Sequence, residues 1–198
     1  MILSTERSED SSPPFLRRRA DERPPNDSLG GATAVIADLC CGMGGISLAA
    51  RQLGMRVVVG VDVNTQAART FGKNFPDAEF IQGSVRSLKV LRRCSELLAV
   101  RSGSPTPSLV VSGPPCQGFS AAGSRNPVDP RNQILVAVAR AIAELKPRCA
   151  LVENVSAVLA KKHNHRLDAF ERTLAEAGYF VDSSEKSVGE FRLGQLAK

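Results

Sequence analysis

The sequence has 198 residues, of which 42% are hydrophobic and 23% are charged, and these values are ordinary for one globular domain. They exclude wholesale disorder, a collagen-like repeat and a disulfide scaffold, and no apolar run reaches the roughly 18–20 residues that a membrane span needs. The formal net charge of +6 favours an anionic partner such as nucleic acid.

Residues 1–31 are predicted to form a disordered polar tail, because they contain proline pairs and many charges but few apolar residues. The arginine triplet at 17–19 could touch DNA phosphates, although we expect a solvated charge cluster. No signal peptide is apparent, so the five cysteines are interpreted as reduced thiols of a cytoplasmic protein. The folded domain is predicted over residues 32–198.

From residue 32 onward, short apolar runs alternate with helical patterns. Strands are predicted at residues 34–39, 56–61, 79–81, 109–112, 150–153 and 179–182. Helices are predicted at residues 46–53, 64–74, 85–100, 134–145 and 167–177. This alternation predicts an α/β, Rossmann-like fold with a mostly parallel sheet and helices on both faces, and ligands bind beyond the carboxyl ends of such strands.

The first predicted strand is followed by a glycine-rich turn, DLCCGMGG, at residues 38–45. Glycines permit a tight turn and close approach of a ligand to the backbone, but such a turn alone is equally consistent with a purely structural role. Asp62 ends the second predicted strand, 24 residues after Asp38, which is near the spacing at which an acid meets ribose hydroxyls. Together they indicate an adenosine-containing ligand without a pyrophosphate, for which S-adenosylmethionine fits better than NAD.

Cysteines and histidines do not have the spacing of a metal site. Cys40 and Cys41 are adjacent, whereas zinc-binding cysteines are separated by two to four residues. His163 and His165 lie on a different, polar segment. We therefore predict no metal, and a structural or cofactor-lining role for the two cysteines.

The motif GPPCQGFS follows the fourth predicted strand and contains Cys116. Two prolines stiffen the backbone before this cysteine, as suits a nucleophile whose position must be held closely. A buried, inert thiol is the alternative, but the polar, glycine-rich loop at the ligand edge favours a reactive thiolate. Glu153 and Asn154 end the fifth predicted strand, where an acid beside a nucleophile would form a catalytic constellation.

With these motifs in this order, residues 34–198 resemble the C5-cytosine DNA methyltransferases. DLCCGMGG resembles the first motif of that family, GVDVN the second and GSV the third. GPPCQGFS is similar to its Pro-Cys nucleophile motif, DPRNQ to the segment that follows, and LVENV to its Glu-Asn-Val motif.

The resemblance implies methyl transfer from S-adenosylmethionine to C5 of cytosine in double-stranded DNA, in the setting of restriction and modification. Cys116 would attack C6 of a base flipped out of the duplex. Glu153 would hydrogen-bond N3 and the exocyclic amine of the cytosine, and Asn154 would hold the Pro-Cys loop. Gln117 and Ser120 would lie on the loop that faces DNA.

The resemblance also implies a set of residues that line the cofactor site. These are Cys40, Gly42, Gly44, Gly45, Asp62, Val63, Val85, Pro115 and Ile134. Two positions near this site depart from the family pattern: Cys40 replaces a phenylalanine, and Ser84 replaces an aspartate that contacts adenine.

The C-terminal residues 190–198 look like a degraded form of the family's Gln-x-Arg-x-Arg motif, with Ala197 in place of the first arginine. We expect the target-recognition region and the final motif to be absent. Two alternatives stay open: a cytosine-5 methyltransferase acting on RNA, and an inactive or split enzyme that needs a second chain for DNA binding.

Overall fold

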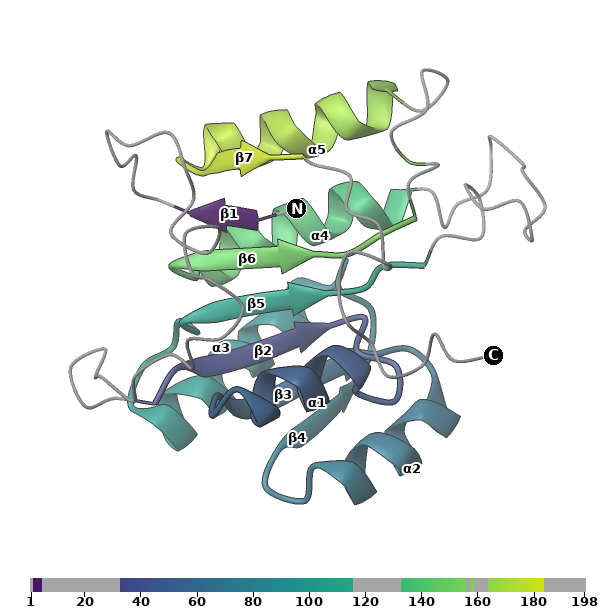
Figure 1. The fold of residues 1–198 in the computed structure, drawn as a ribbon, viewed down its shortest axis with the longest axis vertical. Coiled ribbons are helices and arrows are strands. Elements are labelled where there is room, and N and C mark those ends of the chain that lie inside the picture. The colour runs from purple at the N-terminus through teal and green to yellow at the C-terminus, as the bar shows by residue number, and fades with distance from the viewer. Residues whose placement is uncertain (1, 5–32, 116–132, 156–157, 159–163, 184–198) are drawn as a thin grey trace, which may run out of the picture.

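The computed structural model describes residues 2–4, 33–115, 133–155, 158 and 164–183. Within them lies a seven-stranded sheet in the order β4-β3-β2-β5-β6-β1-β7 (Figure 1). Five neighbouring strands are parallel: β2 (Val35–Leu39), β3 (Arg56–Asp62), β4 (Glu79–Gln82), β5 (Leu109–Ser112) and β6 (Cys149–Val152). The predicted α/β fold with a mostly parallel sheet is confirmed.

Helices cover both faces of the sheet, as predicted (Figure 1). On one face lie α1 (Gly45–Gln52) and α2 (Thr65–Asn74). On the other face lie α3 (Leu88–Ser102), α4 (Ile134–Leu145) and α5 (Asn164–Glu176). None of the helices in these ranges is long and apolar enough to cross a membrane.

The largest part of the core lies between the sheet and α3, α4 and α5. Helix α4 is almost entirely apolar, and Ile142 and Leu145 on it are fully buried. On the opposite face, the ring of Phe71 in α2 packs against that of Phe75, the residue just after α2, with their centroids 4.8 Å apart. Gly60 in β3 makes room for them, because a Cβ atom there would lie 2.5 Å from the Phe71 ring. Apolar burial on both faces therefore explains why the central strands read as continuous apolar runs.

The N-terminal strand β1 (Ile2–Ser4) was not expected. It lies between β6 and β7 (Phe180–Asp182) and pairs antiparallel with both. The prediction of a disordered tail over 1–31 is therefore wrong at residues 2–4, while residues 5–31 lie outside the described residues. Three residues are too few to show an alternating pattern, so the sequence could not predict this strand. The strand is stabilised by backbone hydrogen bonds to its two neighbours.

Helix α3 starts three residues later than predicted. The backbone N–H of Ser87 donates to the carbonyl of Ser84 at 2.9 Å, so residues 84–87 form a turn before the helix. The helix also continues to Ser102 and ends at Gly103, whose φ of 77° needs a glycine. The apolar spacing from Val85 onward is real, but the turn at its start is not helical.

Two buried polar contacts hold the carboxyl end of β2. Asp38 is 1% exposed, and its Oδ2 accepts a hydrogen bond of 2.6 Å from the hydroxyl of Ser47 in α1. Its Oδ1 has no partner among the described residues. The buried hydroxyl of Ser112 in β5 donates to the carbonyl of Leu39 at 2.7 Å. Burial raises the pKa of Asp38 to about 7, although the hydrogen bond from Ser47 acts in the opposite direction.

Asp38 should make the stability of the fold depend on pH. Because its pKa rises from 3.8 to about 7, the folded chain keeps a proton that the unfolded chain loses, so stability falls between about pH 4 and pH 7. The variant Asp38→Asn cannot ionise but still offers an oxygen to Ser47. Urea unfolding should show the variant gaining about 2.5 kcal/mol on the natural chain between pH 5 and pH 8, since two pH units separate pH 5 from the folded pKa and each corresponds to roughly 1.4 kcal/mol.

The matched control for this measurement is Asp77→Asn, which changes an exposed aspartate at the opposite end of the strands. It should leave the pH dependence of unfolding unchanged. If the curves for Asp38→Asn and the natural chain run parallel, the buried proton on Asp38 is disproved.

Candidate active site

The carboxyl ends of four parallel strands lie level along one edge of the sheet. Leu39 pairs with Val61 and Ser112, and Ser112 in turn pairs with Val152. Asp62 is the last residue of β3, and the glycine turn, the Gly-Pro-Pro segment and the Glu-Asn-Val motif directly follow β2, β5 and β6. Asp62 and these three motifs thus lie at one edge of the sheet although more than 100 residues separate the first from the last.

The turn after β2 depends on backbone conformations that few residues adopt. Cys40, Gly42 and Gly44 have φ values of 57°, 52° and 91°. Gly44 cannot be replaced without disturbance, because a Cβ atom there would lie 2.3 Å from the ring of Phe75. The N–H of Cys41 donates to the carbonyl of Val61 at 3.0 Å and ties the turn to β3. Cys40 is a cysteine in a left-handed conformation, which is uncommon for a residue other than glycine.

The Asp62 carboxylate joins this turn to the start of α2. Its Oδ2 accepts a hydrogen bond of 2.9 Å from the N–H of Gly42, and its Oδ1 accepts one of 2.9 Å from the N–H of Asn64. Asn64 in turn caps α2, since its side chain accepts from the N–H groups of Gln66 and Ala67. Each carboxylate oxygen has a second lone pair, so Asp62 can still accept hydrogen bonds from a ligand.

The space beside the turn is open. A Cβ atom placed on Gly42 or Gly45 would meet no other atom within 4 Å, so a ligand can approach the backbone there. Val63, next to Asp62, leaves 66% of its surface exposed. An apolar side chain, an acid and accessible backbone therefore share one rim of the sheet.

The other residues expected to line a cofactor site differ in how much surface they offer. Ile134, at the first turn of α4, and Pro115 are half-buried. Val85 is 5% exposed and packs mainly in the core. Val85 would therefore pack behind the residues that line the site and would offer little surface to a ligand.

The two thiols of the turn are held in their neutral form. Burial raises the pKa of Cys40 to about 12, and the nearby charge of Asp62 adds to this effect. Burial likewise raises the pKa of Cys41 far above its usual value. Neutral thiols are poor nucleophiles and poor metal ligands. In the described part of the chain, no three His, Cys, Asp or Glu residues lie close enough to hold a metal ion.

The segment after β5 is held against the end of β6. The amide Nδ2 of Asn154 donates to the carbonyl of Pro114 at 3.3 Å, and the N–H of Glu153 donates to the carbonyl of Ser112 at 2.9 Å. The side chain of Glu153 is exposed and lies beside Gly113, where a Cβ atom would be 3.7 Å from its Oε2. The acid and the amide of the Glu-Asn-Val motif thus border the backbone that leads to Cys116.

Cys116, Gln117 and Ser120 lie outside the described residues, so their predicted roles stay predictions. The hydrogen bond between Asp38 and Ser47, which connects β2 to α1 beside the turn, was not predicted from the sequence. No spacing rule connects a strand-end aspartate with a serine nine residues later. The pocket between α3, α4 and α5 was not predicted either, because the residues that line it are scattered over three segments of the chain.

Comparisons with known proteins agree with this arrangement. A family model described as C-5 cytosine-specific DNA methylase matches residues 34–185. The chain is 34% identical over 158 residues to the type II methyltransferase M.AgeI of Thalassovita gelatinovora, which covers 80% of this chain and 36% of that protein. It is 33% identical over 150 residues to M.SacI of Streptomyces achromogenes, which covers 73% of this chain and 37% of that protein.

A solved structure is also similar. A candidate DNA modification methyltransferase encoded within a prophage of E. coli superposes with a TM-score of 0.58 at 28% identity, over 73% of this chain and 38% of that one. The chain spans about a third of the length of the curated relatives named above. Because the family model spans most of the chain and the motifs lie at one strand edge, the chain belongs to the C-5 cytosine-specific DNA methylase family.

Proposed function

We propose that this chain carries the catalytic part of an S-adenosylmethionine-dependent enzyme that methylates C5 of cytosine in DNA. The strongest support comes from two neighbouring contacts: Asn154 donates to the carbonyl of Pro114, and the side chain of Glu153 lies beside Gly113. An acid is thereby set next to the two prolines that precede Cys116. Because a nucleophile and a carboxylate that binds the target base must lie near each other, this arrangement supports the proposal.

The residues at the rim of β2 and β3 fit S-adenosylmethionine. Asp62 offers lone pairs for the ribose hydroxyls, and the open backbone at Gly42 and Gly45 allows close approach. Val63 offers an exposed apolar surface for the adenine ring. When bound, the cofactor supplies an electrophilic methyl group that C5 of the cytosine accepts.

In the proposed reaction, the Cys116 thiolate adds to C6 of the cytosine and makes C5 nucleophilic. The C5 proton and the thiolate leave after methylation, which restores the ring and the enzyme. Because C6 is inaccessible in a stacked duplex, the base must be flipped out. Glu153, whose side chain is exposed, would bind N3 and the exocyclic amine and stabilise the charge that develops there.

The lengths of the relatives favour a further component. The two curated relatives named above are nearly three times as long as the stretch that matches, so we propose that recognition of a particular DNA sequence uses residues beyond it. These residues would lie in the same polypeptide or in a second chain. An RNA substrate is the competing possibility, and a transfer assay that offers cytosine in both duplex DNA and RNA distinguishes the two.

Methyl transfer should depend on Cys116. With labelled S-adenosylmethionine and duplex DNA, we expect Cys116→Ala to reduce transfer at least about 1,000-fold, because no other group would form the bond to C6. A duplex with 5-fluorocytosine should give a covalent adduct with the natural chain and none with the variant.

The matched control is Cys149→Ala, which removes a half-buried thiol at the opposite end of the sheet. It should leave transfer and adduct formation intact. Transfer that survives Cys116→Ala would contradict the proposed reaction.

Binding of S-adenosylmethionine should depend on Asp62. In Asp62→Asn, one side-chain oxygen becomes an NH2 group that faces a backbone N–H, so one of the two hydrogen bonds is lost and the turn loosens. The ribose hydroxyls would also lose a charged acceptor, and since a hydrogen bond to a charged group contributes about 1.5–3 kcal/mol, we expect roughly 10- to 100-fold weaker binding by calorimetry. The exposed Asp77→Asn should bind as the natural chain does, and equal affinities for all three proteins would refute the assignment.

A further inference from the structure

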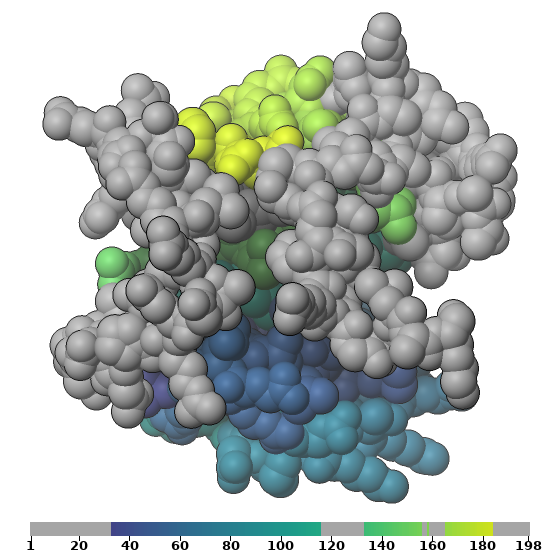
Figure 2. Space-filling model, viewed as in Figure 1, coloured from purple at the N-terminus to yellow at the C-terminus, as the bar shows by residue number. Residues whose placement is uncertain are grey.

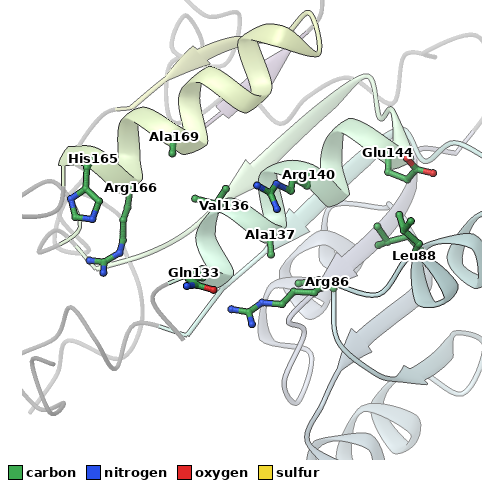
Figure 3. Close-up of a pocket in the computed structure, with 12 residues that line it drawn as sticks. Arg86, Leu88, Gln133, Val136, Ala137, Arg140, Glu144, His165, Arg166 and Ala169 are labelled. Carbon is green, nitrogen blue, oxygen red and sulfur yellow. The ribbon is translucent and has the colours of Figure 1, made fainter. Parts of the chain in front are cut away.

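A pocket lies on the face of the molecule that carries α3, α4 and α5. Its volume is about 880 Å³, and its walls come from the turn before α3, one side of α4 and the first turns of α5 (Figure 3). Nothing in the reaction proposed above uses it. We call it the basic groove and define it by Arg86, Gln133, Arg140, Glu144, His165 and Arg166.

Positive charge dominates this groove. Three arginines, Arg86, Arg140 and Arg166, line it, and among its described lining residues Glu144 carries the one carboxylate. Figure 3 shows Arg86, Arg140 and Arg166 reaching into the gap from three different segments of the chain. A guanidinium group keeps its charge at any physiological pH and presents paired N–H donors that match phosphate oxygens. Three of them in one concave surface therefore favour a ligand with several phosphates.

The groove also adjoins the proposed active site. Gln133 directly precedes Ile134, and Val85, which contributes to the wall of the groove, is one of the expected cofactor-site residues. His165 and Arg166 lie at the start of α5, which follows β6 and the Glu-Asn-Val motif. The groove thus begins at the carboxyl edge of the sheet and leads away from it along α4.

The dimensions of the groove suit a nucleic-acid strand. From Gln133 to Arg140 it follows seven residues of α4, about 10 Å at 1.5 Å per residue. Neighbouring phosphates of one DNA strand lie farther apart than their rise of about 3.4 Å along the axis, so this length suits about two or three phosphates. Glu144 lies beyond Arg140, where its negative charge would limit the run of phosphates.

We propose that the basic groove binds backbone phosphates of the nucleic-acid strand beside the target cytosine. This inference rests on the proposed function for the identity of the polymer. The contacts would carry no sequence information, because phosphates are the same at every nucleotide. Their effect would be to hold the strand while the target base leaves the stack.

The salt dependence of DNA binding tests the proposal. Affinity for a fluorescent duplex, measured from 20 to 200 mM salt, should fall with a logarithmic slope that is smaller by about 0.9 in Arg140→Gln, the value for one lost phosphate contact. At low salt the variant should bind about 5- to 10-fold more weakly. Arg69→Gln, which removes an exposed arginine from α2 on the other face, should keep the natural slope.

Equal slopes for Arg140→Gln and Arg69→Gln would overturn the proposal, provided that circular dichroism shows both variants folded like the natural chain. Inorganic tripolyphosphate is the second probe. If it displaces the duplex at a phosphate concentration no higher than unlabelled duplex needs, the groove is a small-anion site and the proposal is wrong. Methyl transfer by the natural chain reports separately on the proposed function, so either proposal can fail while the other stands.

Discussion

The two hydrogen bonds accepted by Asp62 hold together the part of the molecule on which the proposed chemistry depends. One oxygen binds the N–H of Gly42 in the turn after β2, and the other binds the N–H of Asn64 at the start of α2. A carboxylate at a strand end thereby sets the turn and the entry to the next helix relative to each other. Without this bridge, the N–H of Gly42 would lose the acceptor that fixes it in its left-handed conformation, which glycine can leave at little cost.

Contacts from α1 and from the segment after α2 support this bridge. Asp38 and Ser47 connect β2 to α1 through a buried hydrogen bond, and the Phe75 ring fills the space against Gly44. These contacts all lie around the turn after β2. The Pro114 and Asn154 contact does the same for the neighbouring rim, where β5 and β6 end. The ends of β2 and β3 and the ends of β5 and β6 are thus held by separate contacts along one edge of the sheet. The first pair carries the proposed cofactor site, and the second carries the proposed catalytic residues.

The sequence was most informative for features that depend on the chemical type of each residue and its near neighbours along the chain. Apolar runs located the parallel strands, and Asp62, Glu153 and Asn154 could be placed at strand ends because strands end where apolar runs do. It was uninformative where a feature depends on distant partners. The strand β1 is three residues long and exists through its pairing with β6 and β7. The basic groove gathers arginines from three segments that only the packing of α3, α4 and α5 brings together.

Amide NMR of the isotope-labelled chain shows whether S-adenosylmethionine binds at the turn that Asp62 bridges. We expect the N–H resonances of Gly42 and Asn64, which donate to Asp62, to shift saturably during titration with S-adenosylmethionine. The N–H of Val181, in the edge strand β7, should stay in place. If saturable shifts leave Gly42 and Asn64 unchanged and cluster elsewhere, S-adenosylmethionine does not bind at this turn.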